Sequence, residues 1–282
     1  MQEEANLQVS PLRKLQLDEY EILKSVIKVW EQNGIRYFLG YGTLLGAIRH
    51  QGFIPWDDDV DVFLPRPDFE RFIQIADQVL EEPYFLNNES MSVNINLKHY
   101  RCIEDPSHKQ TRKYGDRLSE YNTRIDIFPL DGAPKSAIGR WWLSFRAAML
   151  KQLIRFPRAY AMGVMDKKRS AAESVIIWLN KTLGIGKLLS PEKMVRSLEK
   201  MRKRHPYDTS EYAYAWVPDY KWKKILCRRE WFGEGVKARF EASAFTVPAD
   251  SDAVLHQFYG DYMSPPPEAL RTTKHSVCSE EA

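Results

Sequence analysis

The sequence predicts an α+β protein with a helical segment inserted into its core. Three observations support this prediction. Apolar residues recur at helical spacing between residues 11 and 33, short apolar segments at 60–64 and 124–128 are typical of strands, and the composition becomes helical between 137 and 205. We therefore expect a core at 1–136, a helical insertion at 137–210, C-terminal strands with the "YGDYM" segment that complete the core at 211–271, and a disordered tail at 272–282.

The N-terminal part alternates helices with short strands. Ser10 can cap the first helix, Pro11 suits its first position, and Gly34 can end it in the left-handed conformation. The next expected elements are a strand at 37–39, a short helix at 44–50, a strand at 60–64 that ends at Pro65, and an amphipathic helix at 69–80.

The following elements are marked by changes in periodicity and by turn residues. We expect one or two strands at 92–103, a charged loop at 109–120, and a strand at 124–128 that ends at Pro129. Helices are expected at 141–160, at 171–183 and from Ser190 onward, and strand signals return between 212 and 247.

The composition limits the classes of function. Of the 282 residues 44% are hydrophobic, so the chain can bury a core, and its net charge of +3 is too small to predict nucleic-acid binding. Cys102, Cys227 and Cys278 are dispersed, which indicates a reducing compartment. The acidic N-terminus has no apolar region after it, and no apolar run approaches the ~18 residues of a membrane span, so we expect a cytoplasmic protein.

The segment "PWDDDVDVFLPR" places four aspartates within five residues, directly before apolar strand residues. On a strand, Asp59 and Asp61 would point to the same face, with Val60 and Val62 packed behind them. Two carboxylates that close repel each other unless a divalent cation lies between them. Because ligand sets made only of oxygen favour Mg²⁺ or Mn²⁺, the run predicts a metal site.

Other residues extend this constellation. Asp126 is the natural third ligand, because it lies between two isoleucines on a half-buried strand, and Asp131 is the alternative. Gly42 and Thr43 lie at a strand-to-helix junction, where backbone N–H groups and a hydroxyl can bind a phosphate. Gly46, one turn later, would allow a ligand or another backbone segment to come close.

Three other interpretations of the acidic run are weaker. An EF-hand loop that starts at Asp57 needs glycine and glutamate at positions 62 and 68, where the chain has valine and aspartate. Glycosyltransferases also use Asp-x-Asp, but usually at the end of an apolar strand, whereas here the apolar residues follow the acids. A solvated acidic turn balanced by Arg49, Arg66 and Arg71 is disfavoured, because apolar residues interleave with the acids.

Three segments together resemble the LicD family of phosphocholine transferases, which decorate bacterial surface glycans and have fukutin and fukutin-related protein as distant relatives. These segments are "YGTLLGAIRHQGFIPWDDDVDVFLPR", "RIDIFPLDG" and "FYGDYMSPPPEALR", and they follow in family order. The resemblance implies a nucleotidyltransferase-type fold with a small mixed sheet and flanking helices. The zinc-finger insertion of the fukutin-related branch has no visible counterpart.

The resemblance also implies roles for particular residues. Gly42 and Thr43 match the phosphate-binding pair, Asp59 and Asp61 match the metal-binding motif, and Asp126 matches the third carboxylate. Family members transfer a phospho-alcohol from a CDP-activated donor to a glycan hydroxyl and release CMP. The expected partners are therefore a CDP-alcohol (choline, ethanolamine, glycerol and ribitol all fit) and a glycan or lipid-linked glycan, and the expected cofactor is Mg²⁺ or Mn²⁺.

In the predicted mechanism the metal links the donor diphosphate to the aspartates, the acceptor hydroxyl attacks the phosphorus, and Asp126 accepts the proton. Arg49 either contacts the diphosphate or complements the C-terminus of the short helix. Asp57 is a candidate for supporting the ligand acids or contacting the donor, as is Asp131. Trp56 is the best single candidate for a cation–π contact with choline.

Two further segments have open interpretations. Tyr212, Tyr214 and Trp216 line one face of a strand, which more often packs within a sheet than forms an aromatic cage. The segment "GRWWLSFRAAMLKQLIRFPRAYAMGV" either makes a peripheral contact with an anionic membrane or forms a helix with one buried face and a charged outer face. The second interpretation is favoured.

The leading interpretation is thus a CDP-alcohol-dependent phosphotransferase that acts on a cell-surface glycan precursor, such as a lipopolysaccharide. The alternatives are a nucleotidyltransferase that acts on a nucleoside triphosphate, a metal-dependent glycosyltransferase, and a scaffold without enzymatic activity. The product distinguishes the first two, because phosphotransfer releases CMP and nucleotidyl transfer releases pyrophosphate.

Overall fold

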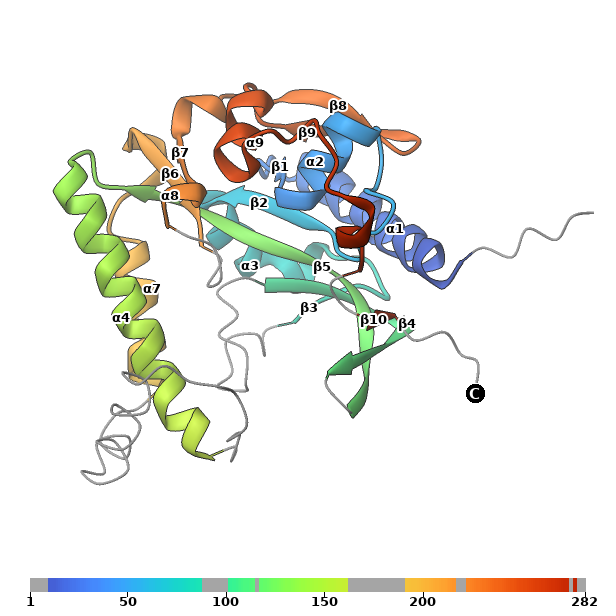
Figure 1. Ribbon diagram of the computed structural model, residues 1–282, viewed down its shortest axis with the longest axis horizontal. Helices are drawn as coiled ribbons and strands as arrows, with labels where there is room; N and C mark the ends of the chain where they lie inside the picture. The colour runs from blue at the N-terminus through green and yellow to red at the C-terminus, as the bar shows by residue number, and fades with distance from the viewer. Residues whose placement is uncertain are drawn as a thin grey trace, which may run out of the picture. The chain divides into compact units, whose positions relative to one another are not determined.

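The computed structural model describes residues 10–87, 101–114, 117–161, 191–216, 222–273 and 276–277 (Figure 1). The chain forms two compact units. The first unit comprises Met1–Asn88, Tyr100–Leu130 and Glu230–Ala282, and the second comprises Glu89–His99 and Asp131–Arg229. Residues 131–136 and 211–229, which we expected in the core, belong to the second unit.

The first unit combines helices with a mixed sheet. Its helices and strands, in chain order, are α1 (Pro11–Gln32), β1 (Phe38–Leu39), α2 (Tyr41–His50), β2 (Asp61–Pro65), α3 (Arg66–Val79), β3 (Phe85–Asn87), β4 (Arg101–Tyr114), β5 (Arg117–Ala133, which runs on into the second unit), β8 (Val236–Phe240), β9 (Ser243–Val247), α9 (Ser251–Tyr259) and β10 (Ser276–Val277).

The punctuation of α1 agrees with the sequence. The Ser10 hydroxyl accepts a hydrogen bond from the Arg13 amide, Pro11 is the first helical residue, and Gly34 has a φ of +61° just after the helix. One face of α1 is buried, because Leu23, Val26 and Trp30 are inaccessible to solvent. The predicted first helix is therefore confirmed, together with its caps.

The sheet follows the order β1-β2-β5-β4-β10. Strand β2 pairs with β1 in the antiparallel sense and with β5 in the parallel sense, and β4 and β5 form a long antiparallel hairpin (Figure 1). Strand β3 adds to β4. This mixed sheet with packed helices agrees with the predicted α+β class.

The β4–β5 hairpin corrects one prediction. Residues 109–120 were expected to form a charged loop, but Lys109–Tyr114 pair with Arg117–Asn122. The charged side chains were interpreted as a sign of a loop. A two-stranded ribbon can, however, carry polar residues on both faces, so charge alone does not exclude strands. The expected disordered tail lies mostly outside the described residues, and within them Ser276 and Val277 pair with β4.

A hairpin and a helix from the C-terminal part complete the first unit. The β8–β9 hairpin turns at Glu241, whose φ is +57° and whose carboxylate binds the Arg13 guanidinium at 2.7 Å. The Glu241 amide also donates to the carbonyl of Gln51, just after α2. Helix α9 packs against α2 (Figure 1). Residues that are distant in sequence thus fix the start of the segment that contains the acidic run.

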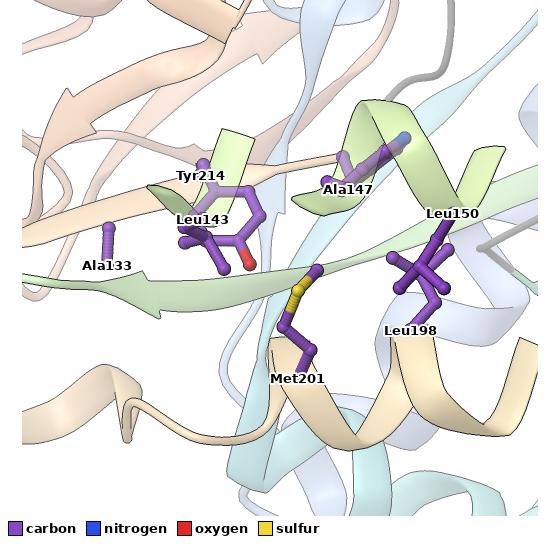
Figure 2. Packing of buried hydrophobic residues seen from close by; sticks show 8 residues of the cluster. Ala133, Leu143, Ala147, Leu150, Leu198, Met201 and Tyr214 are labelled. Atoms are coloured by element: carbon purple, nitrogen blue, oxygen red, sulfur yellow. The ribbon is translucent and has the colours of Figure 1, made fainter. Parts of the chain in front are cut away.

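In its described residues, the second unit is built around two helices. Its helices and strands are α4 (Ala137–Ala161), α7 (Pro191–Arg202), β6 (Tyr212–Ala215), α8 (Trp222–Ile225) and β7 (Leu226–Arg228). Leu143, Ala147 and Leu150 of α4 pack with Leu198 and Met201 of α7 in a buried cluster (Figure 2). The helix expected at 171–183 lies outside the described residues.

No helix in the described part of the chain combines the length and the apolar character of a membrane span.

Candidate functional site

Asp61 and Asp126 lie side by side at the start of the parallel pair β2–β5. Their Cα atoms are partners in the ladder, and the Asp126 amide donates to the carbonyl of Val60 at 2.8 Å. Because paired residues of neighbouring strands face the same side of a sheet, the two carboxylates share one face. Asp61 is 8% exposed, and the side chain of Asp126 is 13% exposed. The structure therefore brings these two predicted site residues together on a largely buried surface.

Asp59 and Asp57 belong to the loop that precedes β2. The strand begins at Asp61, so strand alternation does not by itself fix the direction of Asp59, whose Oδ1 atom is buried. Asp57 and Asp58 are also buried. A solvated acidic turn would expose these carboxylates, so that interpretation is wrong for this chain. Two of the arginines proposed to balance such a turn, Arg49 and Arg71, donate to backbone carbonyls.

The first turn of α2 is bonded directly to the start of β2. The Thr43 hydroxyl accepts a hydrogen bond from the Asp61 amide at 2.8 Å, and the Gly40 amide donates to the Asp61 carbonyl at 2.8 Å. Thr43 keeps its hydroxyl hydrogen for a further acceptor, such as a phosphate oxygen. The predicted glycine-threonine pair and the acidic strand are thus parts of one local structure.

Gly42 provides room for a carboxylate. A Cβ atom built on Gly42 would lie 2.4 Å from Oδ2 of Asp57, which is closer than real Cβ contacts allow. The Asp57 carboxylate therefore occupies the space beside the first turn of α2, where the helix dipole favours an anion. This is the place where the sequence predicted a donor phosphate, so the phosphate role of Gly42 remains a prediction.

Gly46 provides room for backbone. A Cβ atom there would lie 2.4 Å from the carbonyl oxygen of Gly52, in the loop that leads to the acidic run. Of the two close approaches that were predicted for Gly46, the structure shows the one by another backbone segment. The contact lets the chain after α2 fold back along the helix, and so it positions the start of the acidic loop.

Two residues beside Asp126 were not predicted. The Cys102 thiol donates to Oδ1 of Asp126 at 3.0 Å, and Nε of Arg124 lies 3.5 Å from the same oxygen. Arg124 is two residues before Asp126, so the alternation rule could have placed both on one face. Cys102 is the antiparallel partner of Asp126, and no local sequence signal indicates that pairing.

Asp131 has a different environment. It is fully buried in the second unit, where Nε of the equally buried Arg202 lies 2.8 Å from its carboxylate. This ion pair accounts for its charge through a contact between the end of β5 and α7. The structure thus assigns Asp131 a packing role within that unit.

A cluster of cations and aromatic rings lies at the C-terminal end of α2. Nη1 of Arg49 donates to the carbonyl of Tyr262, and its Nε donates to Nε2 of His50. Burial, assisted by the charge of Arg271, lowers the pKa of Arg49, and burial followed by the charge of Arg49 lowers the pKa of His50. Because Nε2 of His50 accepts a hydrogen bond, this nitrogen carries no proton and the imidazole ring is neutral.

Arg271 connects this cluster to Trp56. Its guanidinium lies over the Trp56 ring, 5.5 Å from the ring centre, and the His50 ring contacts the same tryptophan. Arg271 was not among the predicted site residues, although it ends the "FYGDYMSPPPEALR" segment. The structure therefore joins the first and third family segments through Arg49–Tyr262 and Trp56–Arg271.

The predicted aromatic stripe of β6 packs in the second unit. Tyr214 is buried in the same cluster as Leu143 and Met201 (Figure 2), and Trp216 belongs to that cluster as well. The guanidinium of Arg140 lies over the ring of the half-buried Tyr212, 4.2 Å from the ring centre. These aromatic residues thus pack inside the second unit, which is the interpretation that the sequence favoured over an aromatic cage.

The side chains of the described residues form no group of three or more His, Cys, Asp or Glu that could hold a metal ion as they are placed. What the structure does contain is a carboxylate pair in register at positions 61 and 126, with a buried carboxylate oxygen of Asp59 nearby in sequence. The chemistry of this donor set suits Mg²⁺ or Mn²⁺.

Comparisons with known proteins agree with the motifs. Residues 34–160 match the family model described as LicD/FKTN/FKRP, nucleotidyltransferase domain. The lipopolysaccharide cholinephosphotransferase LicD of Haemophilus influenzae is 29% identical over 265 residues, which are 94% of this chain and 96% of that protein. The ribitol 5-phosphate transferase FKRP of mouse and human is 52% identical over 42 residues, which are 15% of this chain and 8% of those proteins. Residues 34–160 therefore form a domain that matches the LicD/FKTN/FKRP family model, and the chain is similar to LicD along nearly its whole length.

Proposed function

We propose that the protein transfers a phospho-alcohol from a CDP-activated donor to a hydroxyl group of a cell-surface glycan and releases CMP. The observation that carries the proposal is the pairing of Asp61 with Asp126 directly beside the first turn of α2. Thr43 in that turn accepts a hydrogen bond from the Asp61 amide and so connects the turn to the strand. It is supported by the similarity to the cholinephosphotransferase LicD along nearly the whole chain. Phosphocholine is therefore the first candidate for the transferred group, and lipopolysaccharide is the first candidate acceptor.

Asp61, Asp126 and Asp59 would hold a divalent cation. Neighbouring carboxylates on a buried face repel each other, and a cation between them removes that cost. When bound, Mg²⁺ would neutralise the diphosphate charge that develops as CMP leaves. Because the three carboxylates are not gathered as ligands in the structure, we expect side-chain movements to accompany binding.

The other residues bind and orient the substrates. The Thr43 hydroxyl and the N-terminus of α2 would donate hydrogen bonds to a phosphate of the donor. The Asp57 carboxylate, which lies beside Gly42, would move aside to make room for that phosphate. The acceptor oxygen forms a bond to the phosphorus that bears the alcohol while the bond from that phosphorus to the CMP oxygen breaks. Asp126 accepts the hydroxyl proton and later releases it to water.

Trp56 is proposed to contact the alcohol. Its ring already carries the guanidinium of Arg271, so it presents a face on which a cation is stabilised. The quaternary ammonium of choline would replace Arg271 on that face. Trp56→Ala should therefore raise KM for CDP-choline more than KM for CDP-glycerol, which has no cation.

The test is a reaction of purified protein and Mg²⁺ with a panel of CDP-alcohols and lipopolysaccharide that lacks the substituent. We expect CMP in the chromatogram and a phospho-alcohol added to the glycan by mass spectrometry. Absence of CMP with every donor would contradict the proposal. Asp77→Asn, an exposed change on α3, is the matched control for the site variants.

The family model's description as a nucleotidyltransferase domain supports a second candidate, transfer of a nucleotidyl group from a triphosphate. The same residues would then hold the triphosphate. Release of pyrophosphate from CTP, without release of CMP from any CDP-alcohol, would favour this function.

A further inference from the structure

Helix α4 has two apolar faces, and the described residues cover only one of them. Leu143, Ala147 and Leu150 are buried against α7 (Figure 2). A second stripe recurs at helical spacing on the outside of α4, and we call it the outer aromatic face. Its members are all at least 45% exposed and are Ile138, Trp141, Trp142, Phe145 and Met149.

The rings of the outer aromatic face form one cluster. Trp141 stacks on Phe145 with ring centres 5.5 Å apart, and Trp142 contacts both rings edge-on. A helix that is apolar on all sides is normally buried or in contact with lipid. Exposed clusters of large apolar side chains mark interaction surfaces in soluble domains. We expected a charged outer face from the sequence, and the described part of α4 corrects that prediction.

The charges of α4 indicate which partner covers this face. Between Ala137 and Ala161 the sequence has no aspartate or glutamate, and its basic residues are Arg140, Arg146, Lys151, Arg155 and Arg158. Arg146 is exposed next to Phe145, whereas Arg140 is directed at Tyr212. Tryptophan and phenylalanine beside arginine and lysine are the composition of a helix that lies in the interface of an anionic bilayer.

A second copy of the chain fits this surface less well. A self-complementary contact along α4 would bring two helices with only positive charges against each other. An anionic lipid surface instead neutralises those charges, at about 1 kcal/mol for each basic residue close to it.

We infer that the outer aromatic face of α4 docks on the headgroup region of an anionic membrane, with the rings at the interface and Arg146 among the lipid phosphates. This inference does not depend on the proposed transfer reaction. It describes a surface contact of one helix, and the helix axis lies along the membrane plane.

The test is flotation of the full chain with vesicles of phosphatidylcholine alone or with 30% phosphatidylglycerol, a composition chosen to supply negative charge. We expect the protein to float with the anionic vesicles and to be released by 0.5 M salt. Trp141→Ser with Trp142→Ser should lower the partition coefficient roughly tenfold. Arg146→Glu should lower it about thirtyfold, because the loss of one favourable charge and the gain of one unfavourable charge each change the binding by about 1 kcal/mol.

Val236→Ser on β8 is the matched control, because Val236 is an exposed apolar residue of the first unit. It should leave flotation unchanged, and all variants should keep the thermal midpoint of the parent chain. The inference is overturned by a failure to float with anionic vesicles, or by equal flotation of the tryptophan variant. It is also overturned if that variant melts early, which would mean that another part of the chain covers the face, or if it converts a dimer to a monomer.

Discussion

At the scale of single residues, the candidate site depends on close contacts that leave no room for additional atoms. Gly42 and Asp57 show this most clearly, because the carboxylate lies where any larger residue would place its Cβ atom. Thr43 and Asp61 are joined by one hydrogen bond between a hydroxyl and an amide. Small changes at these positions should therefore have large effects.

Gly42→Ala should destabilise the protein by about 1–3 kcal/mol, because the new methyl group must displace the Asp57 carboxylate. The loss of stability caused by Gly42→Ala should be smaller in a protein that also carries Asp57→Ala, because the carboxylate that the methyl group would displace is then absent. Urea unfolding of the two single variants and the double variant measures this coupling. An equal cost of Gly42→Ala with and without Asp57 would contradict the steric explanation.

Asp61→Asn and Asp126→Asn should each lower CMP release by ~10²-fold or more, because each removes a charge from the predicted metal set. Both variants should also weaken the binding of Mn²⁺, measured in solution by paramagnetic relaxation of water. The exposed change Asp77→Asn should leave both quantities unchanged. Full activity of Asp126→Asn would exclude Asp126 as a ligand and as the proton acceptor.

The residues that sequence reasoning found and missed differ in a physical way. Asp61 and Asp126 were found because apolar neighbours mark each of them as part of a strand. Cys102 was missed because its pairing with Asp126 spans 24 positions and leaves no local pattern. The contact between Trp56 and Arg271 joins two segments that are more than 200 positions apart, so only the fold reveals it.

At the scale of elements, the acidic loop is held by helices and strands that lie far apart in the chain. Arg13 of α1 binds Glu241 at the β8–β9 turn, and one oxygen of that carboxylate accepts from the amide of Phe53. This connection ties α1 and the hairpin to the chain between α2 and β2. It was not predicted, since neither residue stands in a motif.

The connection predicts a dependence of stability on pH. The hydrogen bond from Arg13 lowers the pKa of Glu241. A carboxyl group whose folded pKa is below its unfolded value of about 4.3 contributes its full stabilisation above that value. The contribution is lost as the pH falls through the lower, folded pKa. It should amount to roughly 1 kcal/mol, because the pair is partly open to solvent.

Glu241→Gln should therefore lower the urea midpoint at pH 7 and flatten its decline below about pH 4.5. The exposed change Glu234→Gln is the matched control, since both residues lie in or beside the β8–β9 hairpin. If both variants follow the same pH profile as the parent, the Arg13–Glu241 contact does not contribute to acid stability.

The elements also show where sequence patterns are sufficient. The caps of α1 and the proline that ends β2 are local signals, and the structure confirms both elements. The outer face of α4 was expected to be charged, but Trp141, Trp142 and Phe145 are exposed on it. A helix with two apolar stripes gives no internal signal of which one is covered.

At the scale of the whole molecule, two compact units share one chain, so unfolding need not be a single transition. The buried pair Asp131–Arg202 belongs to the second unit, where both side chains are inaccessible to solvent. Removing one partner of such a pair leaves an uncompensated buried charge and costs about 3–5 kcal/mol.

Asp131→Asn should therefore shift the unfolding of the second unit to lower urea and leave the first unit nearly unchanged. Far-ultraviolet circular dichroism and hydrogen exchange at peptides of each unit separate the two transitions. The double variant Asp131→Leu with Arg202→Met should recover much of the loss. A uniform loss of protection across both units would show that they unfold together.

The insertion of the second unit has a consequence for synthesis on the ribosome. The strands that carry Asp61 and Asp126 emerge first, but Tyr262, whose carbonyl binds Arg49, emerges only after roughly a hundred residues of the second unit. At 5–20 residues per second this delay lasts roughly 5–20 s. During that interval the nascent chain presents an incomplete sheet to the cytosol or to chaperones, and the cluster at the end of α2 assembles last.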